Sequence, residues 1–396
     1  MNGVPFLVFS VFAIAAVGYA LGRITVKGAA MGTVGVFIIA VVFGALFYGT
    51  LEGELSDHAG DALRILATVG IALFVTAFGL ASGQTFFRNM GRNFKPYVVT
   101  GVVMVLSTAV TAVACILIGR AAGGAETEEL TAVVTGLMSG ALTSAPALSV
   151  AGEAAAESEN LVSAGYALSC LFGVLLPVLF IWIAPKIGKR NMQEERTKLR
   201  EELLEVQNRT KPPKAQKLVK LTDIDKHGLF PFAVCAVLGI FLGSIRIGRF
   251  TLTATVGCLI VSLLIGHFGR IGAVTMKPKQ ETLSLFQEFG LMLFLAAAGI
   301  SGGSCLVSSF RPEYILMGAV LTVVPLAVGS IITRLVFKTG LLNSLGSIAG
   351  GMTSSQAAGA AVNVSKTEDV AMPYAAVYPI AAVSAVIASI IIIHVF

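Results

Sequence analysis

Long apolar stretches alternate with short charged segments along the whole chain. A helix of about 20 apolar residues spans the hydrocarbon core of a bilayer. The apolar runs of the first half fall near residues 5–22, 32–50, 64–87, 97–119, 130–152 and 160–185. After a charged stretch they resume near residues 229–245, 250–268, 283–304, 314–334, 341–363 and 371–395. This pattern predicts an all-α polytopic membrane protein whose surroundings are a lipid bilayer.

Composition supports this prediction and excludes other classes of protein. The chain is 56% hydrophobic and 13% charged, whereas an average soluble domain carries about 25% charged residues. Its net charge is +6, but 12 of its 28 lysines and arginines lie within residues 186–226. A basic cluster beside apolar spans is typical of a cytoplasmic loop, so we expect no nucleic acid as a partner.

Enzyme and metal-site signatures are missing from the sequence. It contains no Walker A loop, no HExxH motif and no paired Cys-x-x-Cys motif, and its five cysteines lie in or beside apolar runs. Without such motifs we expect no enzyme activity, no cofactor and no metal site. Energy for any transport would come from an ion gradient or from exchange, and the coupling ion stays open between Na⁺ and H⁺.

Two segments of the chain recur later in the sequence. Residues 136–147 (GLMSGALTSAPA) align with residues 346–357 (GSIAGGMTSSQA) at an offset of 210. Residues 70–83 and 290–303 share a second pattern of Gly, Leu and Phe at an offset of 220. Since the matches keep their order, they indicate a duplicated unit. The chain then divides into an N-terminal membrane repeat (1–185), a charged linker (186–227) and a C-terminal membrane repeat (228–396).

Loop charges indicate how the chain crosses the bilayer. Basic loops tend to be cytoplasmic, which puts the linker and the basic residues near 23–27 and 88–95 inside. The acidic loops at 126–129 and 153–159 would both lie outside, although they flank the run 130–152. That run would therefore enter the bilayer and return as a re-entrant hairpin.

Each half would contain five transmembrane helices plus one re-entrant hairpin. An odd number of crossings reverses the second half, so the hairpin at 341–363 would open from the cytoplasm. The sequence thus predicts two inverted repeats, a plan typical of secondary transporters. Both termini would lie on the outer side, and the membrane would be the cell (inner) membrane. The linker would be a short exposed helix that ends before Pro212 and continues as a solvated loop.

The two hairpin tips are the candidate substrate site. They read Thr143, Ser144, Ala145, Pro146 and Thr353, Ser354, Ser355, Gln356. A Ser or Thr can cap a helix N-terminus, whose free N–H groups attract a carboxylate without a charged side chain. The alternative is that these hydroxyls only cap helices or bond across a packed bundle.

Five further residues complete the candidate site. They are Gly140, Gly350, Asn160, Asn363 and Gln84. The glycines would allow backbones to approach closely, and the amides would add contacts. No Lys or Arg lies in the middle of an apolar run. This favours a small anionic or zwitterionic substrate, such as an amino acid or carboxylate, held by backbone dipoles and hydroxyls.

Residues 136–147 and 73–87 (LFVTAFGLASGQTFF) resemble the membrane region of the aspartate–alanine exchanger family. The resemblance implies a ten-span permease that exchanges small carboxylates or amino acids such as aspartate and alanine. It also implies that the protein is a homodimer and that it uses elevator-type alternating access, in which a hairpin-bearing core moves against a scaffold. Two features depart from the family: the large cytoplasmic regulatory insert is missing, and Gln84 and Gln356 stand where its pattern favours proline.

Other functions remain open at this point. A sodium-coupled symporter of the glutamate type is the alternative, because such proteins also combine two inverted halves with glycine-rich hairpins. A channel with the hairpins as its filter, or a membrane scaffold without a solute, is less favoured by the repeated Thr-Ser tips.

Overall fold

The structure of the protein is a computed structural model, and helices form nearly all of its regular structure. It describes residues 3–26, 29–56, 58–89, 95–121, 127–187, 192–209, 225, 227–247, 250–251, 253–271 and 274–396. The helices of the first half are α1 (Val4–Gly22), α2 (Val34–Glu54), α3 (Ala59–Asn89), α4 (Lys95–Ala121), α5 (Thr127–Ala141), α6 (Ala145–Ala154) and α7 (Glu159–Ile187). Helix α8 (Met192–Arg209) follows in the linker.

The second half repeats this order of helices. They are α9 (Leu229–Gly243), α10 (Ala254–Phe268), α11 (Gln280–Ser309), α12 (Pro312–Ile331), α13 (Leu341–Gly351), α14 (Ser355–Ser365) and α15 (Ala371–Val395). Short 3₁₀ turns precede α7 and α15 at Ala156–Ser158 and Glu368–Val370, and a π turn at Ile332–Val336 ends α12.

Three antiparallel two-residue ladders join neighbouring helices. They are β1 (Thr25–Val26) with β2 (Ala29–Ala30), β3 (Arg246–Ile247) with β4 (Phe250–Thr251), and β5 (Arg270–Ile271) with β6 (Val274–Thr275). In the described part of the chain, eight helices are long and apolar enough to cross a membrane. Helices α9 and α10 are shorter, at 15 residues each. The run expected at 250–268 is shortened because Phe250 and Thr251 at its start form β4, and the run expected at 229–245 ends as a helix at Gly243.

Each of the runs 130–152 and 341–363 is two helices rather than one. Helices α5 and α6 are separated by residues 142–144, and α13 and α14 by residues 352–354. The direction of each second helix follows from glycine contacts. Gly136 approaches Val162 of α7, and Gly140 approaches Tyr166 one turn further along both helices. Helices α5 and α7 are therefore parallel. Helix α6, which connects them along the chain, must run in the opposite direction.

The second pair repeats this arrangement. Gly346 approaches Val370 at the start of α15, and Gly350 approaches Tyr374 one turn later. Helices α13 and α15 are thus parallel, and α14 returns towards the start of α13. We refer to α5–α6 as the first helix pair and to α13–α14 as the second helix pair.

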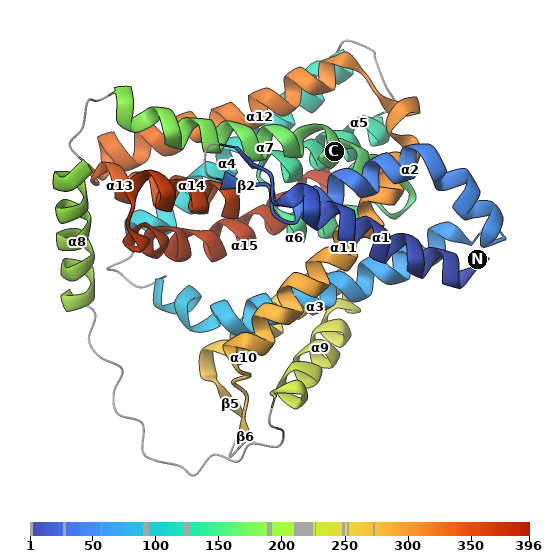
Figure 1. Cartoon of the computed structure of the whole chain (residues 1–396), viewed down its shortest axis with the longest axis horizontal. Helices are drawn as coiled ribbons and strands as arrows, with labels where there is room; N and C mark the ends of the chain where they lie inside the picture. Colours follow the sequence, from blue (N-terminus) through green and yellow to red (C-terminus); the bar gives the residue numbers. More distant parts are fainter. Residues whose placement is uncertain are drawn as a thin grey trace.

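The helices gather into two bundles that lie against each other (Figure 1). The first bundle consists of α1–α3 and α9–α11, and the second of α4–α7 and α12–α15, with both helix pairs. Helix α8 stands beside the start of α13 and the end of α14 in Figure 1. We call the side of a helix pair where its first helix starts and its second helix ends the open end of the pair. Helices α7 and α11 make the broadest contact between the bundles. One hydrophobic cluster runs across this contact, so the two bundles share a core.

Equivalent residues of the two halves meet where α3 crosses α11. A Cβ atom added to Gly70 would lie 2.7 Å from the carbonyl oxygen of Gly290, and one added to Gly290 would lie 2.6 Å from that of Gly70. Arg64 precedes Gly70 in α3 and Ser301 follows Gly290 in α11, yet these two residues line one cavity. Since the later residue of α11 faces the earlier residue of α3, the two helices run antiparallel.

Candidate functional site

The break in each helix pair has the same backbone geometry. Thr143 and Thr353 have positive φ angles of 51° and 46°. Such left-handed backbone is uncommon for residues other than glycine, and it turns the chain sharply before the second helix of each pair. The repetition of a strained threonine at both breaks indicates a shared role.

The residue after each threonine caps the helix that follows. Ser144 accepts a hydrogen bond from the N–H of Ala147 at 3.4 Å, and Ser354 accepts one from the N–H of Ala357 at 3.2 Å. Both serines are buried, with 2% and 0% of their surface exposed. Their hydroxyls satisfy N–H groups that an uncapped helix would leave free. The capping function predicted from the sequence is thus present at both breaks.

The two tips contact each other directly. The Thr143 hydroxyl donates to the carbonyl oxygens of Met352 and Thr353, each at 3.3 Å. In return, the Thr353 hydroxyl donates to the carbonyl oxygen of Leu142. These hydrogen bonds join residues that lie about half a chain apart in sequence, so the tips form one crossed contact inside the second bundle.

Close backbone packing holds each tip in place. A Cβ atom added to Gly140 would lie 2.6 Å from the carbonyl oxygen of Tyr166, and one added to Gly350 would lie 2.8 Å from that of Tyr374. Real Cβ atoms do not come this close, so only glycine allows α5 and α13 to lie against α7 and α15 at this distance.

The remaining tip residues differ between the halves. Ala145 and Pro146 are buried in the first turn of α6. At the matching positions of α14, Ser355 is exposed and Gln356 is 9% exposed. Gln356 donates from its amide to the carbonyl oxygen of Met31, at 3.2 Å, in the segment before α2. The second tip is therefore hydrogen-bonded to the other bundle through the glutamine that departs from the family pattern.

Two of the three amides proposed from the sequence, Asn160 and Asn363, lie away from the tips. Asn160 lies about 20 Å along α7 from Gly173, whose backbone packs against Thr143. Asn363 is exposed and lies about 13 Å along α14 from Ser354. Gln84 lies in α3, but its side chain is outside the described part of the structure.

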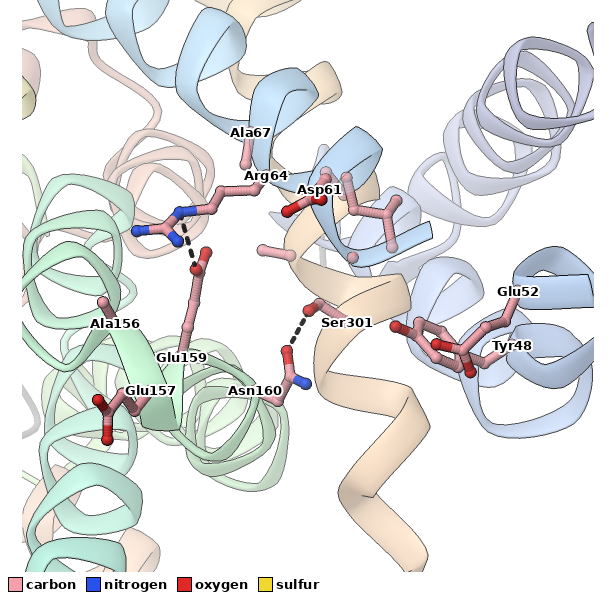
Figure 2. A pocket seen from close by; sticks show the side chains of 14 residues that line it. Tyr48, Glu52, Asp61, Arg64, Ala67, Ala156, Glu157, Glu159, Asn160 and Ser301 are labelled. Carbon is pink, nitrogen blue, oxygen red and sulfur yellow. Dashed lines mark hydrogen bonds and ion pairs between the residues drawn. The ribbon is translucent and has the colours of Figure 1, made fainter. Parts of the chain in front are cut away.

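Asn160 instead lines a cavity of about 260 Å³ between α2, α3, α7 and α11 (Figure 2). The lining residues are Tyr48, Glu52, Gly60, Asp61, Leu63, Arg64, Ala67, Ala156, Glu157, Glu159, Asn160, Ala297, Ala298 and Ser301. The cavity lies at the contact between the two bundles, because α7 belongs to the second and the other three helices to the first.

Polar contacts cross the cavity from bundle to bundle. In Figure 2 the Arg64 side chain points towards Glu159, and Arg64 Nε lies 3.8 Å from Glu159 Oε2. The Ser301 hydroxyl donates to Asn160 Oδ1 nearby. The side chains of Arg64 and Glu159 are 56% and 31% exposed. Both charges are therefore accessible to a solute that enters the cavity.

A second cavity, of about 30 Å³, extends from this space towards α6. It is lined by Arg64 and Glu159 and also by Ser149 and Glu153. Glu153 Oε1 accepts a hydrogen bond from the Ser149 hydroxyl at 2.9 Å and another from the Thr255 hydroxyl of α10. Polar side chains next to the cavity therefore include two on α6, the helix that begins at the first tip.

Comparison with known proteins places the chain in a family. The family model for the membrane region of aspartate–alanine exchangers, described as a predicted permease membrane region, matches residues 10–186 and 231–394. The chain belongs to the aspartate–alanine exchanger family. The resemblance seen in the sequence is confirmed.

Curated relatives match the chain from end to end at low identity. An uncharacterized transporter of Bacteroides fragilis is 25% identical over 95% of this chain and 96% of its own length. An uncharacterized transporter of Bacteroides thetaiotaomicron has the same identity and coverage, and one of Rhodopirellula baltica is 23% identical over 94% of the chain and 96% of its own length.

The exchanger-family match leaves the linker out. It stops at residue 186 and resumes at residue 231. The alignment with the Bacteroides fragilis protein spans 531 residues, more than the 396 of this chain. The relative therefore carries residues that this member of the family lacks, in agreement with the missing insert.

Sequence reasoning overlooked the charges of the cavity. Arg64 is the only Lys or Arg between Lys27 and Arg88, and it follows an acidic segment with Glu52, Glu54, Asp57 and Asp61. A single basic residue there runs against the usual charge bias of loops. That anomaly was the signal for Arg64, but nothing in the sequence links it with Glu159 and Ser301 on other helices.

Proposed function

We propose that this chain is a secondary active transporter that exchanges small amino acids or carboxylates, such as aspartate and alanine, across a cell membrane. The observation that carries the proposal is the cavity between the bundles, with a cationic Arg64 opposite acidic side chains. The family match and the names of the curated relatives support a permease.

The cavity has groups for both ends of an amino acid. A guanidinium binds a carboxylate through two parallel N–H donors. Asp61 lies on α3 with Arg64 and Glu52 lies on α2, and either carboxylate could receive an ammonium group. A substrate carboxylate on Arg64 would replace the weak contact with Glu159, which lies on the other bundle. Substrate binding would thereby loosen one link between the bundles.

Release of links between the bundles would serve an elevator-type mechanism. The second bundle contains both helix pairs and would move as a unit, while α1–α3 and α9–α11 would stay as the scaffold. Arg64 with Glu159 and Thr255 with Glu153 are side-chain contacts that such a movement must break. Water or a substrate can replace both of these polar contacts at a small net cost.

The proposed membrane arrangement is two inverted repeats, each with one re-entrant hairpin. The antiparallel self-contact of α3 with α11 supports an axis in the membrane plane, because such an axis reverses every helix. The returning courses of α6 and α14 support re-entrant hairpins. The linker would then be cytoplasmic and both chain ends outside, in a homodimer.

Thermal stabilisation of the purified protein by candidate substrates tests this proposal. Binding to the folded state alone raises stability by about 2.7 kcal/mol at a hundredfold excess over Kd. We expect aspartate and alanine to raise the melting temperature without sodium. Stabilisation that requires sodium would favour the glutamate-type symporter, and no stabilisation by any amino acid or dicarboxylate would contradict the proposal.

A further inference from the structure

Helix α8 lies across the open end of the second helix pair rather than free in solution (Figure 1). The sequence predicted an exposed helix, and the helix is present, but one of its faces is buried. Leu199 is 1% exposed and packs in a cluster with Ile181 of α7 and Leu345 of α13. The linker helix therefore connects the end of the first half to the second helix pair.

Two carboxylates of α8 cap the N-terminus of α13. Glu195 Oε2 accepts from the N–H of Leu341 at 2.7 Å, and Glu202 Oε1 accepts from the N–H of Gly340 at 2.8 Å. Glu202 Oε2 also accepts from the side-chain amide of Asn343 at 2.6 Å. Carboxylates at this end of a helix interact favourably with its dipole and make short, charge-assisted hydrogen bonds.

A cation of the same helix holds the end of α14. Arg196 Nε donates to the carbonyl oxygen of Ser365, the last residue of α14, at 2.7 Å. A positive charge is favourable where helix carbonyls are free. Helix α8 thus places negative charge at the start and positive charge at the end of the second helix pair, and the three side chains together form what we call the α8 clamp.

The first helix pair differs from the second in the charges at the start of its first helix. Helix α5 carries Glu128 and Glu129 in its own first turn, whereas the first turn of α13 has no acidic residue. The linker supplies to α13 the charge that α5 carries in its own sequence. The contacts are also selective within α8, because Glu195 is buried while its neighbours Glu194 and Glu201 are exposed.

We propose that the α8 clamp is a brake on transport: it ties α13 and α14 to the linker helix and slows a local opening of the second helix pair, a step separate from the movement of the whole bundle. This inference rests on the proposed transport function. The clamp residues lie within residues 187–230, which the family model does not match. The brake is thus a device of this chain's linker, outside the two segments that the family model matches.

The test compares two double variants of equal charge. Glu195→Gln with Glu202→Gln removes the clamp carboxylates but keeps their oxygen acceptors, and Glu194→Gln with Glu201→Gln is the matched control on the exposed face. Initial rates of labelled-aspartate counterflow are measured in proteoliposomes. We expect the clamp variant to exchange roughly two- to fivefold faster than the control at an unchanged half-saturation concentration, because fewer charge-assisted bonds must break.

A third variant and a second readout separate a brake from a structural support. Arg196→Gln should also accelerate counterflow, and hydrogen exchange of the Gly340 and Leu341 amides should be faster in the clamp variant. A clamp variant that exchanges aspartate at the control rate or more slowly overturns the brake. Absence of counterflow in the unmodified protein and in the control overturns the proposed function instead.

Discussion

The first and second helix pairs repeat the same break, yet their open ends lie in different surroundings. At the tips, Thr143 and Thr353 share a left-handed backbone, and each donates a hydrogen bond to the other tip. At the opposite ends, α6 leads to a cavity with Arg64 and Glu159, whereas α14 is held by Arg196 of the linker helix.

This difference separates what the two helix pairs share from what each has of its own. The tips join the two halves through the same pair of threonines, whereas the cavity lies beside the first pair and the α8 clamp holds the second. The predictions below test this division, beginning with the largest expected effect.

Replacement of Arg64 by Gln should cause the largest loss of transport. A hydrogen bond to a charged group contributes about 1.5–3 kcal/mol, so counterflow should fall by about tenfold or more. Arg64→Lys should recover only part of this loss, because lysine keeps the charge but not the paired donors. The measurement is the initial rate of aspartate counterflow in proteoliposomes.

The exposed Arg23, at the end of α1, provides the control for Arg64. Arg23→Gln removes the same charge away from the cavity lining and should leave the rate unchanged. Equal losses in both variants would mean that net charge matters and that the cavity arginine does not.

Substitution of the tip glycines should have the largest effect on stability. Gly140→Ala would bring a Cβ atom within 2.6 Å of a carbonyl oxygen of α7, and Gly350→Ala would do the same at 2.8 Å on α15. Overpacking of this kind costs about 1–3 kcal/mol. We expect lower melting temperatures in detergent for both variants, and a larger drop for Gly140→Ala. A stable Gly140→Ala protein would contradict the close packing of α5 on α7.

The crossed contact between the tips should contribute less and should do so equally in both halves. Thr143→Val and Thr353→Val keep the shape of the side chain and remove the hydrogen bonds to the opposite tip. Each should lower the free energy of unfolding by about 1 kcal/mol, measured as a shift in melting temperature. A much larger effect of one threonine would show that the two tips are not equivalent.

The smallest effect is expected at Gly359, where a side chain should help. An added Cβ atom meets nothing within 4 Å there, in contrast to Gly350 on the preceding helix. Alanine is favoured over glycine within a helix by about 0.8–1.0 kcal/mol. Gly359→Ala should therefore raise the melting temperature slightly, and a decrease would indicate a contact at this face of α14 that forms in another state.

The sequence was most informative where local chemistry decides the structure. Apolar runs bounded by charges predicted the helices, and the repeated Gly, Thr and Ser residues predicted both breaks and their serine caps. The run at 250–268 came out shorter as a helix because Phe250 and Thr251 at its start pair in a ladder. Such pairing depends on the neighbouring segment rather than on hydrophobicity.

The cavity and the clamp could not be predicted in the same way. Arg64, Glu159 and Ser301 come from three helices, and only packing of the bundles brings them together. In the linker, the sequence predicted an exposed helix, but it does not reveal that Glu195 faces α13 while Glu194 faces outward. Tertiary contacts decide both features, and a single sequence carries no record of them.

Counterflow by the unmodified protein tests the central claim most directly. Proteoliposomes loaded with unlabelled aspartate or alanine are diluted into labelled aspartate without any ion gradient. The account predicts rapid, transient accumulation of label that depends on the internal amino acid and not on sodium. Uptake that occurs only with a sodium gradient, or no accumulation with either amino acid inside, would contradict it.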